Sequence, residues 1–300
     1  MMKSASRSRL LLLFFPFTCI AFLFSGCGSG GGAGSGRPAF PTSRGYTTWS
    51  RTYGGASEDS LRSIELTTDG NYIAAGQTKS TGSGDYDMWV IKIDPRGNTI
   101  WSKTFGGSQE DAARSVRQTF DGGYIVAGYT KSNGAIGQDV YVVKLDKDGE
   151  KEWERRIGGA ENDWAASAEQ LSDGGYIIGA STLSYGSGDY DFWIIRLNQS
   201  GTTIWSKTFG GSDWDTVSAA QQTPDGNIIV SGFTFSLPYT SGNADFMLLK
   251  LTIDGTQLWF KTYGDADNDV VFSIGQTEDG AFVAAGYGGS PPDAFVVKTD

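Results

Sequence analysis

The segment DGGYIVAGYT (residues 121–130) decides the fold, because it joins a tight turn to a β-strand. Asp-Gly is a strong signal for a hairpin turn, and the apolar run that follows favours a strand buried on both faces. A first strand over Ala112–Thr119 precedes the turn, and Gly123–Thr130 forms the second. A third strand over Val140–Leu145 and a fourth over Glu150–Ile157 complete a predicted four-stranded antiparallel sheet.

This unit is repeated five times, with spacings of 52, 52, 52 and 54 residues between copies. Four markers recur once in each copy, and the first three keep these spacings. They are the tryptophans Trp49, Trp101, Trp153, Trp205 and Trp259; the Asp-Gly pairs that begin at Asp69, Asp121, Asp173, Asp225 and Asp279; a first aspartate set, Asp59, Asp111, Asp163, Asp215 and Asp269; and a second set, Asp87, Asp139, Asp191, Asp245 and Asp293. We interpret the tryptophans as packing residues and both aspartate sets as caps of loop amides. Each second-set aspartate is followed five residues later by Lys or Arg, which we expect to be its partner: Lys92, Lys144, Arg196, Lys250 and Lys298.

Radially repeated four-stranded sheets are the blades of a β-propeller. The last copy stops after its third strand, at Phe295–Thr299, and a matching fourth strand over Thr47–Thr52 stands at the beginning. We therefore predict an all-β, five-bladed propeller over residues 42–300, closed by pairing of these two segments. A larger ring or an open stack of repeats is the alternative.

The stretches over residues 121–130 and 87–101 resemble the delta-60-like tandem β-propeller repeats of bacteria. Such repeats are common in secreted and lipid-anchored proteins and mostly have no assigned activity. The resemblance therefore implies an architecture and a location outside the cytoplasm, and it implies no particular activity.

The pattern of the first residues indicates an export signal. Three basic residues precede an apolar run over Leu10–Phe24. The following Ser25-Gly26-Cys27 resembles the lipobox of bacterial lipoproteins, which implies a signal peptide over residues 1–26 and acylation of Cys27. Gly28 after the cysteine implies the outer membrane where the cell has one, with the domain facing the periplasm or the exterior. An ordinary cleaved signal and an uncleaved anchor are the alternatives; residues 27–41 form a Gly/Ser-rich tether.

Composition excludes several classes of function. The chain has no histidine, which removes the usual general base and the commonest metal ligand. A formal charge of −10, from 24 basic and 34 acidic residues, argues against nucleic acid as a partner. Apart from Cys19 in the signal and Cys27, there is no cysteine, so no disulfide or Cys metal site is expected.

The longer loops of all five blades should gather at one rim, which is the default binding surface. Symmetry breaks between the fourth and fifth blades, where a long loop over residues 235–240 stands beside a short one over 288–292. We expect a notch there. The candidate rim residues are Trp214, Asp213, Tyr239, Asp265, Asp267 and Trp164.

The sequence favours a lipid-anchored binding or scaffold module for a protein or glycan, with no catalysis and no cofactor. Two alternatives stay open. A glycoside hydrolase would need two carboxyl groups about 5–9.5 Å apart in unlike environments, and repetition favours like ones. A calcium-stabilised adhesion protein would need six to eight oxygen ligands, to which Asp265–Asp269 is the nearest approach.

Overall fold

The computed structural model describes residues 48–236, 238, 240 and 243–299, and all regular elements in this part of the chain are β-strands. No helix in these residues is long and apolar enough to cross a membrane. The predicted signal peptide, the acylated Cys27 and the tether up to residue 41 lie outside the described residues, and so does Tyr239. Those predictions therefore stay predictions.

Nineteen strands form five antiparallel sheets, here called blades 1 to 5. Blade 1 contains β1 (Asp59–Leu66), β2 (Tyr72–Thr78), β3 (Asp87–Ile93) and β4 (Thr99–Phe105). Blade 2 contains β5 (Asp111–Gln118), β6 (Tyr124–Thr130), β7 (Asp139–Leu145) and β8 (Lys151–Ile157). Blade 3 contains β9 (Asp163–Gln170), β10 (Tyr176–Thr182), β11 (Asp191–Leu197) and β12 (Thr203–Phe209). Blade 4 contains β13 (Asp215–Gln222), β14 (Ile228–Thr234), β15 (Asp245–Leu251) and β16 (Gln257–Tyr263). Blade 5 has three strands, β17 (Val270–Gln276), β18 (Phe282–Gly288) and β19 (Asp293–Thr299).

The Asp-Gly turns set the register within each blade. In blade 2, the amide of Gly122 donates to the carbonyl of Thr119 at 2.9 Å, and Gly122 has φ +82°, which glycine adopts without steric cost. The turn places Gln118 opposite Tyr124, and the pairing runs to Asp111 opposite Thr130 with one bulge on the way. The same turn and bulged register recur in the other blades.

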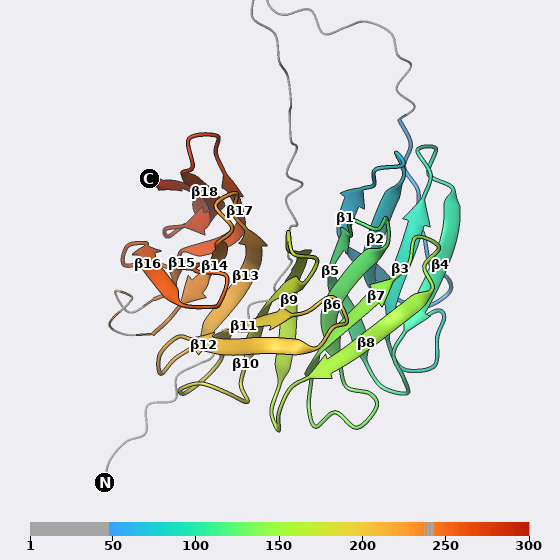
Figure 1. Cartoon of the computed structure of the whole chain (residues 1–300), viewed down its shortest axis with the longest axis horizontal. Helices are drawn as coiled ribbons and strands as arrows, with labels where there is room; N and C mark the ends of the chain where they lie inside the picture. The colour runs from blue at the N-terminus through green and yellow to red at the C-terminus, as the bar shows by residue number, and fades with distance from the viewer. Residues whose placement is uncertain (1–47, 237, 239, 241–242, 300) are drawn as a thin grey trace, which may run out of the picture.

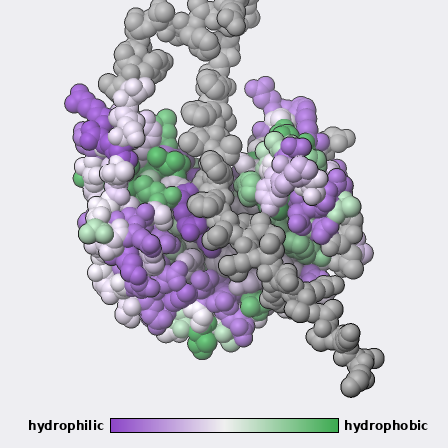
Figure 2. Space-filling model, turned by 180° about the vertical axis from the view of Figure 1, so that it is seen from behind, coloured by the Kyte–Doolittle hydropathy of each residue, from purple (hydrophilic) through white to green (hydrophobic). Residues whose placement is uncertain are grey.

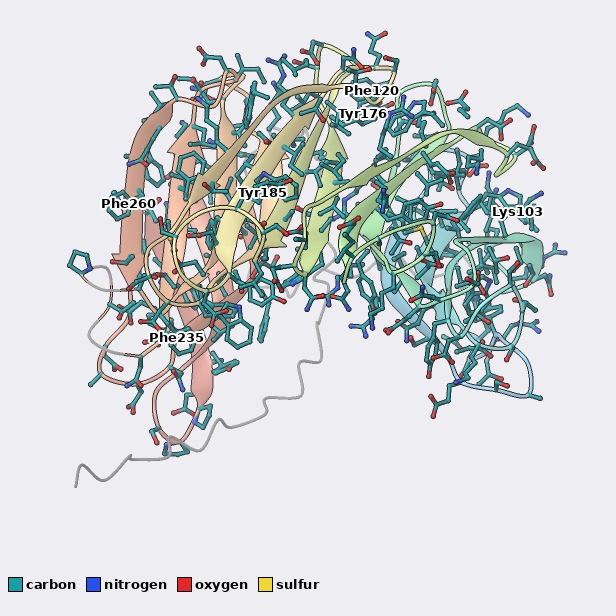
Figure 3. The ribbon with its side chains drawn as sticks, turned by 90° about the horizontal axis from the view of Figure 1, so that it is seen from below. Lys103, Phe120, Tyr176, Tyr185, Phe235 and Phe260 are labelled. Atoms are coloured by element: carbon teal, nitrogen blue, oxygen red, sulfur yellow. The ribbon has the colours of Figure 1, made fainter. Side chains whose placement is uncertain are left out.

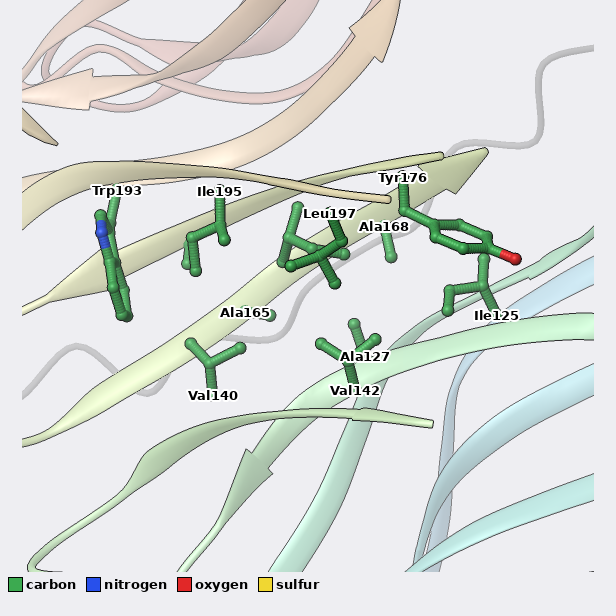
Figure 4. Close-up of a cluster of buried hydrophobic side chains, with 12 residues drawn as sticks. Ile125, Ala127, Val140, Val142, Ala165, Ala168, Tyr176, Trp193, Ile195 and Leu197 are labelled. Carbon is green, nitrogen blue, oxygen red and sulfur yellow. The ribbon is translucent and has the colours of Figure 1, made fainter. Parts of the chain in front are cut away.

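The hydrophobic core lies between neighbouring blades. In blade 2 every residue of β6 and β7 is buried, whereas β8 at the outer edge is partly exposed. Figure 4 shows one junction, where Ile125 and Val142 of blade 2 meet Ile195 and Leu197 of blade 3. Burying an aliphatic side chain of this size contributes about 1.5–3 kcal/mol, so each junction is a major source of stability.

The blades follow one another around an open arc, from β1–β4 to β17–β19 (Figure 1). The first strands of consecutive blades contact each other, so they form the inner wall of the arc and surround its axis. The fold is thus propeller-like, with the five repeats predicted from the sequence. The predicted closure is not confirmed: residues 48–52 form no strand, and among the described residues β19 pairs with β18 alone.

Candidate binding site

The two ends of the blades differ in kind. At one end, the long-loop rim, the carbonyl of Tyr86 accepts a 2.7 Å hydrogen bond from the amide of Asp111, so the loops before both aspartate sets lie together. The opposite end, the tight-turn rim, carries the Asp-Gly turns. Figure 3 shows this separation: Phe120 lies at the tight-turn edge of the blades, and Phe235 lies toward the other edge.

The first aspartate set holds the loops of the long-loop rim. Asp111 accepts hydrogen bonds from the Gly107 amide and the Ser132 hydroxyl, both at 2.8 Å. Asp215 does the same with Gly211 and Ser236, at 2.7 and 2.8 Å. Both carboxylates are buried, and the scaffold's own donors occupy the Oδ2 atom of each.

The predicted pairing of the second aspartate set with the bases is wrong. Lys92 forms its ion pair with Asp69 of the Asp-Gly turn, at 2.7 Å, and Asp87 accepts the amide of Ser83 at 2.9 Å instead. Five residues along a strand span about 17 Å, so the aspartate and the base lie at opposite ends of β3. In every blade the base pairs with the turn aspartate, through Lys144–Asp121, Arg196–Asp173, Lys250–Asp225 and Lys298–Asp279.

One member of the second set borders a pocket. Asp191, together with Gly186, Met247 and Phe260, lines a pocket of about 230 Å³ between blades 3 and 4. Burial raises the pKa of Asp191 to about 6, and the nearby Asp215 carboxylate adds to the shift. Among the residues that line this pocket, Asp191 is the one acid, and none is a base.

The repeated tryptophans pack against the following blade, edge-on to an aromatic ring. The centroid of Trp101 lies 5.8 Å from that of Tyr124, and Trp153 lies 5.5 Å from Tyr176. Trp259 meets Phe282 in the same way, at 6.1 Å. These residues serve the junctions between blades.

The described candidate rim residues contact side chains and amides of the loops around them. Trp214 is 38% exposed and stacks on Phe235 at 6.3 Å, with Tyr190 at 6.1 Å. The amide of Asp213 is bonded to Ser236, and Asp265 accepts the amide of Asp267 at 2.9 Å in the next loop along the arc. The notch stays a prediction, because its central residue, Tyr239, lies outside the described residues.

Two positions along the inner wall depart from the repeat. The side chain at the bulge of the first strand varies between blades, and so does the one three residues later. These are Arg62 and Glu65 in blade 1, Arg114 and Arg117 in blade 2, Ala166 and Glu169 in blade 3, Ser218 and Gln221 in blade 4, and Phe272 and Gly275 in blade 5. Comparing these columns of the repeat could have identified them from the sequence.

Three of these charges, on the first strands of blades 1 to 3, influence one another. The guanidinium of Arg117 lowers the pKa of both Glu65 and Glu169, and the Glu65 carboxylate raises that of Glu169. Burial is the largest influence on both glutamates and raises their pKa values. Each also accepts a backbone amide from the next blade, at 2.6 Å for Glu65 and 3.1 Å for Glu169.

Arg114 lies toward the long-loop rim, flanked by aromatic rings. Its guanidinium carbon lies 4.1 Å from the ring centroid of Trp164 and 5.6 Å from that of Tyr129. Its Nε is buried and has no hydrogen-bond partner in the described part of the chain. Burial, with Arg62 nearby, lowers the pKa of Arg114 to about 10, so it carries its charge at neutral pH.

No metal centre is assembled from the described residues: no three Asp, Glu, Cys or His side chains gather there. In particular, the Asp265–Asp269 stretch considered for calcium uses its carboxylates on its own loop, where Asp269 accepts the amide of Asp265 at 3.0 Å.

Comparison with known proteins gives the fold and little more. No family model matches the chain. The regulatory protein FlaEY of Caulobacter vibrioides is 24% identical over 184 residues, which are 52% of this chain, so that the chain spans only 19% of that protein's length. A puromycin hydrolase mutant complexed with PGG has a TM-score of 0.52 at 12% identity, covering 81% of this chain and 38% of its own. An endo-arabinase from Bacteroides thetaiotaomicron has a TM-score of 0.43 at 13% identity, covering 79% and 91%.

Proposed function

We propose that this protein is a lipid-anchored, extracytoplasmic β-propeller of the tandem-repeat kind, which binds a protein or glycan and performs no catalysis. The observation that carries the proposal is the contrast between scaffold and inner wall. Residues that cap loops or join blades follow the repeat, whereas the inner-wall positions differ from blade to blade. Positions that vary on a regular frame are those where recognition of a ligand is expected.

The anchor is argued from Cys27 and the apolar run before it. Several acyl chains hold a protein firmly at a membrane, because each buried CH₂ contributes about 0.8 kcal/mol. Cys27→Ser should move the protein from the membrane fraction to the soluble fraction and abolish labelling by a fatty acid. Retention at the membrane without labelling would instead indicate an uncleaved apolar anchor.

We also propose that the arc closes into a five-bladed ring. Half of the closing junction is already formed by the segment before β1. Trp49 lies edge-on to Tyr72, with ring centroids 6.4 Å apart, and its Nε1 donates to the carbonyl of Pro95. Trp205 donates to the carbonyl of Ile253 in the same way at the junction between blades 3 and 4. Tyr53 packs on the outer face of blade 1, where the fourth strand of a preceding blade would lie.

The two end blades keep apolar surface uncovered. Leu61 and Ile64 on β1 are 38% and 40% exposed, although their equivalents in blade 2, Ala113 and Val116, are fully buried. On blade 5, Val296 is 63% exposed, whereas its equivalent in blade 4, Leu248, is fully buried. Figure 2 shows hydrophobic side chains on both of the blades that face this gap. Burial of these residues against each other would favour closure.

The repeated base gives a third argument. Lys92 lies over the ring of Tyr124, and Lys250 over that of Phe282, each at 5.7 Å and each on the following blade. Their side chains are 9% and 15% exposed, whereas that of Lys298 is 57% exposed. In a closed ring Lys298 would lie over Tyr72 of blade 1.

A disulfide tests the closure. By the register of β15 with β16, in which Leu248 pairs with Lys261, Val296 should pair with Arg51. Arg51→Cys with Val296→Cys should therefore crosslink within one chain, since paired positions satisfy disulfide geometry. Arg51→Cys with Val297→Cys is the control, because a shift of one residue turns the side chain to the other face. Closure is wrong if neither pair links, or if both link equally.

Binding itself is tested by capture. The purified full chain, immobilised, should retain a defined protein or glycan from the envelope of its own cell, and heat-denatured chain should not. Retention of nothing by either sample contradicts the proposed role.

Hydrolysis of a glycan is the second candidate, and Glu65 with Glu169 is the observation that favours it, since burial raises the pKa of both. Their environments are alike, however: each accepts one backbone amide and each faces Arg117. A glycosidase needs one acid and one base with pKa values pushed apart. Turnover of a polysaccharide panel that is lost in Glu169→Gln would establish this candidate over the first.

A further inference from the structure

Arg114 differs from the other buried bases in what surrounds it. Lys92, Lys144, Arg196 and Lys250 all reach a carboxylate of their own blade. Arg114 has rings on its flanks, no ion pair among the described residues and a buried Nε without an acceptor. The Nε of Arg196 is also buried without a partner, but its terminal nitrogens bond to the carbonyl of Ile253 and to Asp173. The terminal nitrogens of Arg114 have no acceptor among the described residues, and an unpaired buried donor costs about 1–3 kcal/mol.

The carboxylate that acts on Arg114 within the protein is already engaged. Glu110 accepts a hydrogen bond from the hydroxyl of Tyr129 and another from Lys131, both at 2.5 Å. The neighbouring charge on the inner wall is Arg62, of the same sign as Arg114. Two guanidinium groups at one end of the axis produce a positive spot in a chain whose formal charge is −10.

We propose that Arg114, assisted by Arg62, binds the carboxylate of a small ligand at the long-loop mouth of the ring axis. A guanidinium is the natural receptor for a carboxylate, because its planar N–H groups match the two oxygens in a fork. Stacking on Trp164 holds that plane in one orientation, which lowers the entropy lost on binding. Arg114 is only partly covered overall, so its free edge is reachable from solvent.

The surroundings define the rest of the ligand. Tyr190 lies near Arg114, whose charge lowers the pKa of the tyrosine hydroxyl. The ring centroid of Tyr190 lies 6.1 Å from that of the exposed Trp214. A flat apolar face, of a pyranose or of an aromatic ring, fits such a surface. The same rim carries exposed acids, including Glu58, Glu161 and Asp213, which repel a polyanion. The site is thus suited to one carboxylate on one ring.

This inference deepens the proposed binding role and is tested by titrating the purified full chain, followed by the NMR signals of the added compound. The probes are D-glucuronate, phenylacetate and, as the uncharged match of the first, D-glucose. At least one carboxylate should bind and glucose should not. Binding by glucuronate alone identifies a sugar acid, and binding by phenylacetate alone identifies an aromatic acid.

Variants assign the binding to the site. Arg114→Gln should weaken binding of the carboxylate at least tenfold, and Arg62→Gln should weaken it several-fold. Arg96 is an exposed arginine on the tight-turn rim, so Arg96→Gln should change the affinity less than twofold. A thermal melt of each variant checks folding, and Arg62→Gln serves if Arg114→Gln does not fold. The inference is overturned if neither carboxylate binds, if glucose binds equally, or if the arginine variants bind like the parent. If capture of a partner succeeds in the earlier test while these titrations fail, the binding role stands and this site is wrong.

Discussion

The hydroxyl of Ser167 accepts a 2.9 Å hydrogen bond from the backbone amide of Ala220, one blade further along the chain. Ser63 does the same for Val116 at 3.2 Å, and Ser115 for Ala168 at 3.3 Å. In blade 4 the equivalent residue is Ala219, and the neighbouring Ser218 donates to the carbonyl of Val271 at 2.6 Å instead. The inner strands are thus joined by side chains where strand pairing cannot reach.

Ser167→Ala should lower the free energy of unfolding by about 1–3 kcal/mol, because the amide of Ala220 loses its acceptor. Ser172→Ala on the exposed turn should change it by less than about 0.5 kcal/mol. Denaturant unfolding followed by tryptophan fluorescence measures both. Equal effects of the two substitutions would show that the bridge contributes nothing.

A proline leaves one acceptor unused. The side-chain oxygens of Gln118, Gln170 and Gln222 accept the amides of Thr68, Phe120 and Ser172 on the preceding blade. The oxygen of Gln276 is buried without a partner among the described residues, because Pro224 stands at the matching position and has no N–H.

Pro224→Ser should supply the missing donor. Proline also restrains the unfolded chain, so the two effects oppose each other in the single variant. A double-mutant cycle with Gln276→Ala isolates the bond, and we expect a favourable coupling of about 1 kcal/mol. A coupling of zero in urea unfolding would mean that the new amide does not reach Gln276.

Asp191 should make stability fall as the pH rises. Its pKa is about 6 in the folded protein, against about 3.9 for an unperturbed aspartate. The folded state therefore binds the proton more tightly, and its contribution is complete below about pH 4 and lost as the pH rises through 6. A shift of this size corresponds to at most about 3 kcal/mol.

Asp191→Asn should consequently flatten the melting temperature between pH 4 and 7, relative to the parent. The amide side chain still offers an oxygen to the Ser187 amide, which bonds to Asp191 at 2.6 Å. Glu161→Gln, at an exposed carboxylate, is the control. If the parent and Asp191→Asn show the same pH profile, the buried aspartate is ionised throughout.

Calcium should leave the melting temperature unchanged to within about 1 °C, with or without a chelator. The first aspartate set already accepts loop amides and hydroxyls, as Asp111 and Asp215 do. Calcium needs six to eight oxygens around one ion. A rise of several degrees at millimolar calcium would favour the adhesion-protein alternative.

The five repeats could be predicted because their signals are local. An Asp-Gly pair such as Asp121-Gly122 specifies its own turn, and the apolar run after it specifies a buried strand. The pairing of Asp87 with Lys92 was wrongly predicted from the same regularity, since nearness in sequence is not nearness along an extended strand. A repeated spacing therefore identifies equivalent residues in each blade, but it does not identify which residue each of them contacts.

The candidate site was predicted less well, because the prediction rested on loops whose lengths differ between blades. The residues that distinguish the blades, such as Arg114 and Glu169, lie on regular strands and differ only in identity. Trp164 was among the candidate rim residues, but its contact with Arg114 depends on how two blades meet. Such contacts follow from tertiary packing, which no pattern within one repeat contains.

The serine bridges join residues 53 positions apart, one more than a full repeat, at every junction where they occur. Each of blades 1 to 3 therefore brings the acceptor for its successor, and blades 2 to 4 bring the donor for their predecessor. Duplicating or excising blade 2 or blade 3 during evolution would leave the remaining serine junctions with matched chemistry. Curvature, rather than bonding, then sets how many copies such a chain can carry.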